Sequence, residues 1–195
     1  MLLTQRKQSV MTDIDEQVAV PRCYMTALAD GTLVSKTDAR IATCGDLDEL
    51  SAHLGAVCAA LKKITETVAS VQVDELHQIQ MRLHDVQRQL FAIGARVVGA
   101  QTPKAMDWAE AVGTLTTDVA QWMQRDIRFR GFILPAGSGA ACQVHIARTV
   151  CRRAERSMVA LQDQTSVEYL NVLSKYLFHL ALFLNQVEGV DEIIL

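Results

Sequence analysis

Apolar residues recur at intervals of three and four positions along most of this chain. That spacing is typical of amphipathic helices rather than of strands. The longest stripe runs from Leu76 to Val97, and four other segments repeat the same spacing. The pattern therefore predicts five helices, at residues 47–61, 76–97, 108–122, 144–161 and 170–187.

Capping signals indicate several of the helix ends. Asp46, with Glu49 three residues later, has the pattern of a helix N-terminus, and Ser138 is expected to cap the fourth helix. Gly99 is expected to end the second helix. The connections are short or moderate, which favours antiparallel neighbours in one all-α, five-helix bundle.

The composition supports a single globular domain. The 195 residues are 50% hydrophobic and 21% charged, which lies in the ordinary globular range. We expect the helical domain to occupy residues 21–195 and to follow a flexible N-terminal tail at residues 1–20, where no apolar period is found. Residues 20–43 are expected to connect the tail to the first helix.

Charge and hydropathy narrow the classes of partner. A formal net charge of −3 argues against binding to nucleic acid. The most apolar stretch, residues 170–187, is too polar to span a membrane, and the N-terminus lacks the apolar core of a secretory signal, so a cytoplasmic location is expected. Five scattered cysteines without zinc spacing predict reduced thiols and no metal site built by the protein.

The strongest chemical signal lies in the fourth predicted helix. Arg148, Arg152 and Arg156 recur every four residues and share one side of the helix with Glu155. Like charges so close together need an anion or a carboxylate among them, and guanidinium groups match phosphate oxygens well. The residues alone leave two interpretations open, a phosphate site and a solvated or ion-paired face.

Two other segments are suggestive but carry less weight. Residues 132–139 form an apolar run that turns through small residues into a helix N-terminus, where free backbone N–H groups can bind an anion. Phe132 by itself would be interpreted as a core residue. Asp48 and Glu49 are explained by the positive end of a helix dipole. The sequence contains no phosphate-binding glycine loop of the Walker or Rossmann type.

Four blocks of sequence together resemble the PduO-type ATP:cob(I)alamin adenosyltransferases in order and spacing. The most specific is Ala-Arg-Thr-Val-Cys-Arg-Arg-Ala-Glu-Arg, which follows a Phe-Ile-Leu-Pro turn. The resemblance implies a homotrimeric five-helix bundle with its active site between subunits. It also implies that cob(I)alamin attacks the 5′-carbon of ATP to give adenosylcobalamin and tripolyphosphate. The matching blocks are residues 36–41 with 45–50, residues 86–87 with 90–95, residues 132–135 with 145–156, and residues 169–174.

The resemblance also implies roles for individual residues. Phe132 would lie under the corrin ring and exclude the lower axial ligand, and Asp48 would pair with Arg152 of a neighbouring subunit. Mg²⁺ would accompany ATP, and a cob(II)alamin reductase or an adenosylcobalamin-dependent enzyme would be a further protein partner. The implied ATP contacts are Lys36, Arg148, Arg152, Glu155, Arg156 and Asn171.

The chain departs from the family pattern at several positions. The Thr-x-Thr-Gly-Asp-x-Gly loop that wraps the ATP phosphates is replaced by a shorter segment at residues 24–33. Val172 and Lys175 stand in place of an arginine and an aspartate, Leu182 replaces an arginine, and Ala136 replaces a glycine or serine. These changes leave an alternative open: a diverged, non-catalytic paralogue that binds or delivers a corrinoid. A helical interaction protein with neither ligand and another nucleotide-binding role are the remaining alternatives.

Overall fold

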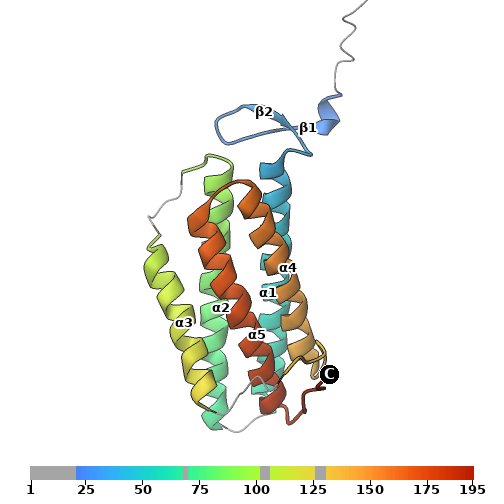
Figure 1. Cartoon of the computed structure of the whole chain (residues 1–195), viewed down its shortest axis with the longest axis vertical. Helices are drawn as coiled ribbons and strands as arrows, with labels where there is room; N and C mark the ends of the chain where they lie inside the picture. Colours follow the sequence, from blue (N-terminus) through green and yellow to red (C-terminus); the bar gives the residue numbers. More distant parts are fainter. Residues whose placement is uncertain (1–20, 68–69, 102–105, 126–130) are drawn as a thin grey trace, which may run out of the picture.

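The computed structural model describes residues 21–67, 70–101, 106–125 and 131–195, so the predicted tail at residues 1–20 lies outside the described residues. Within the described part, five long helices run up and down along one axis (Figure 1). This confirms the predicted helical bundle. The helices are α1 (Ala39–Thr65), α2 (Ser70–Val97), α3 (Trp108–Gln124), α4 (Gly139–Ala160) and α5 (Gln164–Val187).

Helix α5 is the centre of the packing. It contacts α4 on one side and α3 on the other, while α1 joins α4 to α2. Its residues are buried almost all round, as expected for a helix enclosed by neighbours. The ring of Phe183 stacks on Trp122 of α3, with centroids 5.5 Å apart. The apolar stripes identified in the sequence therefore meet in one continuous core.

The predicted start of the first helix was wrong. Helix α1 begins at Ala39, and its cap is Asp38, whose side chain accepts from the N–H of Arg40 at 2.9 Å. The same arginine side chain pairs with Asp38 and lowers the pKa of that carboxyl to about 2. Asp46 lies inside the helix. The Gly-Asp pair has the composition of a start signal, but the helix has already begun at the Asp38 cap, so it continues through Gly45.

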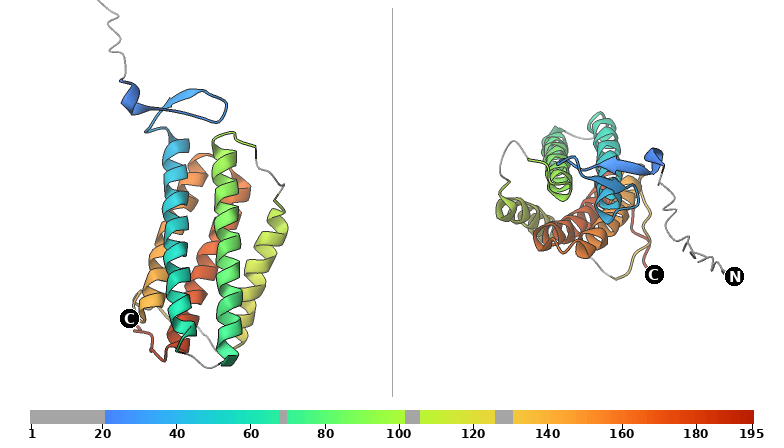
Figure 2. Two further views of the ribbon diagram at one scale, coloured as in Figure 1. Left: turned by 180° about the vertical axis from the view of Figure 1, so that it is seen from behind. Right: turned by 90° about the horizontal axis from the view of Figure 1, so that it is seen from above.

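The connecting segment before α1 contains more structure than the sequence predicted. A short 3-10 helix, η1 (Arg22–Tyr24), leads into an antiparallel hairpin of β1 (Met25–Ala27) and β2 (Leu33–Ser35). The hairpin lies across the ends of α1 and α2 (Figures 1 and 2). The N–H of Ala29 in its turn donates to the carbonyl of Val98 at 3.1 Å, which attaches the turn to the end of α2.

Other helix ends agree with the sequence more closely. The Ser138 side chain caps α4 by accepting from the N–H of Ala141 at 3.2 Å, as predicted. Gly99 follows the end of α2 with a φ of +75°, a conformation that favours glycine. Helix α5 starts at Gln164, earlier than predicted, because Asp163 caps it. None of the helices in the described residues is long and apolar enough to span a membrane.

Candidate functional site along helix α4

Three arginines form an uncompensated basic surface on α4. Arg152 and Arg156 are exposed and Arg148 is half-buried. The Nη1 group of Arg156 donates to the backbone carbonyl of Arg152 at 3.0 Å, and the four-residue spacing puts both residues on the same side of the helix. Among the described residues, no carboxylate forms an ion pair with any of the three. We call Arg148, Arg152 and Arg156 the arginine face.

The inner end of the arginine face is partly desolvated. The Nε atom of Arg148 is buried and has no hydrogen-bond partner among the described residues. Its guanidinium lies 5.9 Å from the centre of the Phe178 ring on α5. Burial, and then the neighbouring charge of Arg152, lower the pKa of Arg148, although an arginine keeps its charge at neutral pH. A half-buried cation of this kind gains from an anion placed beside it.

Glu155 and Asn171 are brought together next to the arginine face. The Asn171 side-chain amide on α5 donates to Glu155 Oε1 on α4 at 2.9 Å. The pair opens onto a shallow depression of about 500 Å³ on the surface. Both residues were predicted from the sequence as ATP contacts, and the packing of α4 on α5 makes them neighbours. The depression is also lined by Gln164, Val167, Glu168 and Val172.

Arg153 has a different task from the arginines that flank it. Its Nε donates to Asp46 on α1 at 2.8 Å, and its Nη2 donates to Glu49. The hydroxyl of Ser157 donates to the other Asp46 oxygen at 2.6 Å. The sequence interpretation of Asp46 and Glu49 as a capping pair was therefore wrong: both carboxylates hold α4 against α1.

Phe132 lies at the opposite end of α4 from Arg156. Its side chain is 80% exposed, so the interpretation of Phe132 as a plain core residue was wrong. From Gly139, where α4 begins, to Arg152 the helix axis rises by about 20 Å. The exposed aromatic ring and the arginine face are therefore held apart by one rigid element.

Asp48 and Lys36 do not meet the arginine face within one chain. Asp48 is exposed and lines an apolar groove of about 340 Å³ between α1 and α2, next to Phe91, whose side chain is 75% exposed. No basic group of the described residues lies within ion-pair distance of Asp48. Lys36 is exposed between β2 and α1, at the end of the bundle where α4 finishes. The sequence did not single out this groove.

Comparison with known proteins identifies the family. The family model described as cobalamin adenosyltransferase matches residues 24–184, which include all five helices up to the last turn of α5. A cobalamin adenosyltransferase from Cupriavidus metallidurans is 37% identical over 175 residues, 87% of each chain. The chain belongs to the cobalamin adenosyltransferase family.

Solved structures of this adenosyltransferase family share the fold. A variant of the PduO-type ATP:corrinoid adenosyltransferase from Lactobacillus reuteri, complexed with ATP, superimposes with a TM-score of 0.70 at 27% identity, covering 89% of this chain and 95% of that one. A second variant of that enzyme, complexed with cobalamin and ATP, gives a TM-score of 0.69 at 26% identity, covering 89% and 94%.

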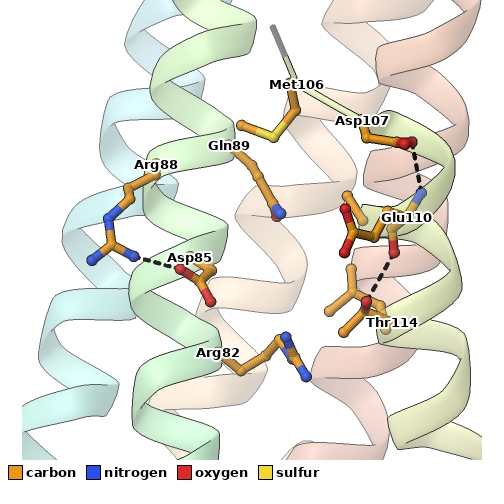
Figure 3. A pocket seen from close by; sticks show the side chains of 10 residues that line it. Arg82, Asp85, Arg88, Gln89, Met106, Asp107, Glu110 and Thr114 are labelled. Carbon is orange, nitrogen blue, oxygen red and sulfur yellow. Dashed lines mark hydrogen bonds and ion pairs between the residues drawn. The ribbon is translucent and has the colours of Figure 1, made fainter. Parts of the chain in front are cut away.

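A polar pocket between α2 and α3 contains none of the predicted site residues of this adenosyltransferase-family chain. It has a volume of about 370 Å³ and lies across the bundle from α4 (Figures 1 and 3). Both arginines that line it are already paired: Arg88 pairs with Asp85, and Arg82 pairs with Asp118. Arginines that are already paired offer little attraction to a phosphate, so the pocket is not the candidate site.

Proposed function

We propose that this chain transfers the 5′-deoxyadenosyl group of ATP to cob(I)alamin. The electron pair of cobalt attacks C5′ of ATP, the C5′–O bond breaks, and tripolyphosphate leaves. The observation that carries the proposal is the arginine face beside Asn171, since three cations without a carboxylate partner among the described residues of their own chain suit a polyphosphate. Membership in the cobalamin adenosyltransferase family supports the same reaction.

The arginine face would both bind ATP and stabilise the leaving group. Negative charge moves to the triphosphate as the C5′–O bond breaks, and fixed guanidinium groups stabilise charge that develops in the transition state. Glu155 and Asn171 would hold the nucleoside part, with Lys36 closing the site from the hairpin end. Mg²⁺ would be carried mainly by the phosphates, since no cluster of three His, Cys, Asp or Glu lies among the described residues.

Phe132 would serve the corrinoid rather than the nucleotide. Its exposed ring presents an apolar surface at the far end of α4 from Arg156. Such a surface cannot ligate cobalt and would keep water and the lower ligand away, which makes the metal easier to reduce to its nucleophilic state. The protein's contribution is orientation and exclusion, while the corrinoid supplies the nucleophile.

A complete site needs a second copy of the chain. Asp48 faces the groove between α1 and α2, whereas Arg152 belongs to the surface of α4, so each lacks an ionic partner among the described residues of one chain. A contact between two different faces is heterologous, and three such contacts close a ring with threefold symmetry. We therefore propose a homotrimer in which Asp48 of one subunit pairs with Arg152 of the next.

One observation favours the alternative of a non-catalytic corrinoid carrier. In the turn between β1 and β2, the N–H groups of Leu28, Gly31 and Thr32 are used by internal hydrogen bonds. This turn stands where the family pattern has its phosphate-wrapping loop. A carrier would bind the corrinoid without depending on ATP.

The two functions are separated by one experiment. Purified protein is mixed with chemically reduced cobalamin, with and without ATP, and the absorption spectrum is followed before and after illumination. The proposed transferase gives a light-sensitive cobalt–carbon product only when ATP is present. If the protein binds corrinoid but forms no light-sensitive product at millimolar ATP, the transferase proposal is wrong and the carrier function is supported.

A further inference from the structure

The last three residues of the chain run antiparallel to the segment that carries Phe132. The N–H of Leu195 donates to the carbonyl of Phe132, and the N–H of Leu134 donates to the carbonyl of Ile193, both at 2.9 Å. The residues between these bonds form an antiparallel bridge. A segment from before α4 is thus held by the C-terminus, far away in the sequence.

One buried side chain connects this segment to its surroundings. Asn185, in the last turn of α5, is only 1% exposed. Its Oδ1 accepts from the N–H of Ser138 at 2.8 Å. Its Nδ2 donates to the carbonyl of Ala136 at 3.3 Å and to Glu192 Oε1 at 2.9 Å. The carboxamide therefore joins the turn before α4, the start of α4 and the C-terminal residues.

The chain leaves space for this carboxamide at Gly137. The φ of Gly137 is +118°, a conformation that side chains with a Cβ rarely adopt. A Cβ at this position would overlap the side chain of Asn185. The turn after Phe132 is consequently shaped around Asn185, and neither can change without moving the other.

We propose that Asn185 is a positioning residue that holds Phe132 in place through the turn at residues 134–138 and the C-terminal residues 192–195. The inference rests on the proposed function, because Phe132 needs a fixed position only if it faces the corrinoid. Asn185 touches neither substrate, and acts by fixing the backbone on which the exposed ring stands.

Phe132 needs such support because an exposed ring on a loop does not by itself offset the entropy lost when the loop is fixed. Fixing the backbone of a loop costs conformational entropy, and the largely exposed ring of Phe132 recovers little of that cost by burial. The carboxamide and the C-terminal ladder supply backbone hydrogen bonds that do not depend on the ring. A group that must block one face of cobalt needs a position defined to within about 0.5 Å, which requires such support.

The first test measures the support itself, without any substrate. In Asn185→Ala, hydrogen exchange at Leu134 and Leu195 should accelerate by at least about tenfold, while the centre of α4 stays protected. Gln186→Ala alters the next, exposed residue and should leave both rates unchanged. Equal exchange at Leu134 in Asn185→Ala and the parent would refute the inference whether or not the protein is a transferase.

The second test measures the consequence for cobalt. Displacing the ring by about 1 Å should lower kcat for adenosylation about 10- to 100-fold and leave KM for ATP unchanged. The four-coordinate cob(II)alamin signal in electron paramagnetic resonance should decrease in parallel. Deleting residues 193–195, which are exposed, should have the same effect without disturbing the core. Unchanged kcat and an unchanged signal in both variants would refute a positioning role.

A paired substitution distinguishes positioning from simple damage. Asn185→Asp loses the donor and places a second carboxylate beside Glu192, so kcat should fall. Adding Glu192→Gln restores one hydrogen bond with donor and acceptor exchanged, and should recover at least about half of the lost activity. No recovery, in a double variant with parental helicity, would contradict the proposal. A parent protein that forms no adenosylcobalamin would instead refute the proposed function, before any variant is compared.

Discussion

The guanidinium of Arg153 lies 2.8 Å from the carboxylate of Asp46 and joins α4 to α1. The neighbouring Arg152 is exposed and has no ionic partner among the described residues. Two adjacent arginines of one helix thus have separate tasks. The first maintains the bundle, and the second is available to a ligand or to another subunit.

The first prediction concerns Arg153. Arg153→Ala removes the bonds to Asp46 and Glu49, so the free energy of unfolding should fall by about 1–2 kcal/mol. ATP affinity should not change. Urea denaturation and titration calorimetry measure the two quantities on the same preparation. Weaker ATP binding with unchanged stability would assign Arg153 to the site instead of to the helix packing.

The matched variant, Arg152→Ala, should behave in the opposite way. Losing a charge-assisted contact to phosphate should weaken ATP binding by about 1.5–3 kcal/mol. The free energy of unfolding of the dissociated subunit should change by no more than about 0.5 kcal/mol, because the side chain is exposed within one chain. If the variant binds ATP as tightly as the parent, the arginine face is a solvated surface and not a phosphate site.

A third prediction concerns assembly. Multi-angle light scattering at micromolar concentration should give a trimer. Reversing one charge, with Asp48→Lys, should weaken the trimer, and combining it with Arg152→Glu should restore it because the attraction is re-established. A monomeric parent would contradict the proposed arrangement. So would a double variant no more associated than Asp48→Lys alone.

A fourth prediction separates stability from cobalt chemistry at Phe132. Because the ring is 80% exposed, Phe132→Ala should cost less than about 1 kcal/mol of unfolding free energy, whereas a buried phenylalanine costs about 3–5 kcal/mol. Corrinoid should still bind, but the four-coordinate cob(II)alamin signal should disappear and adenosylation should slow. A variant with parental coordination and rate would remove Phe132 from the corrinoid site.

A fifth prediction is a pH dependence of stability from His145 on α4. This residue is 3% exposed, and burial, together with the charge of Arg148, lowers its pKa to about 4, against about 6.5 in an unfolded chain. Between about pH 4 and pH 6.5 the His145 imidazole is therefore protonated in the unfolded chain and neutral in the folded one. The contribution of His145 to the free energy of unfolding should therefore be fully present above about pH 6.5. It should decrease by about 3 kcal/mol as the pH falls to 4.

The check uses urea midpoints measured between pH 7.5 and pH 4.5. His145→Gln cannot titrate, so its stability should depend less steeply on pH than that of the parent. Identical slopes in the two proteins would show that the acid sensitivity comes from other groups.

Much of the architecture follows from the sequence itself. The apolar stripes determine five helices, because a period of three and four residues allows a helix to bury one side. The arginine-rich run, together with the Phe-Ile-Leu-Pro turn that precedes it, is enough to indicate the family. The arginine face is also local, since residues four positions apart share one side of any helix.

The tertiary structure decided which neighbour each side chain meets. Helical spacing places Asp46 and Asp48 on different sides of α1. Only the packing of α4 against α1 brings Arg153 to Asp46 and leaves Asp48 facing a groove. Likewise, nothing near Asn185 in the sequence points to Ser138 and Ala136, its partners from the other side of α4. The period of a helix orients its side chains relative to one another, while their partners depend on contacts between segments far apart in the chain.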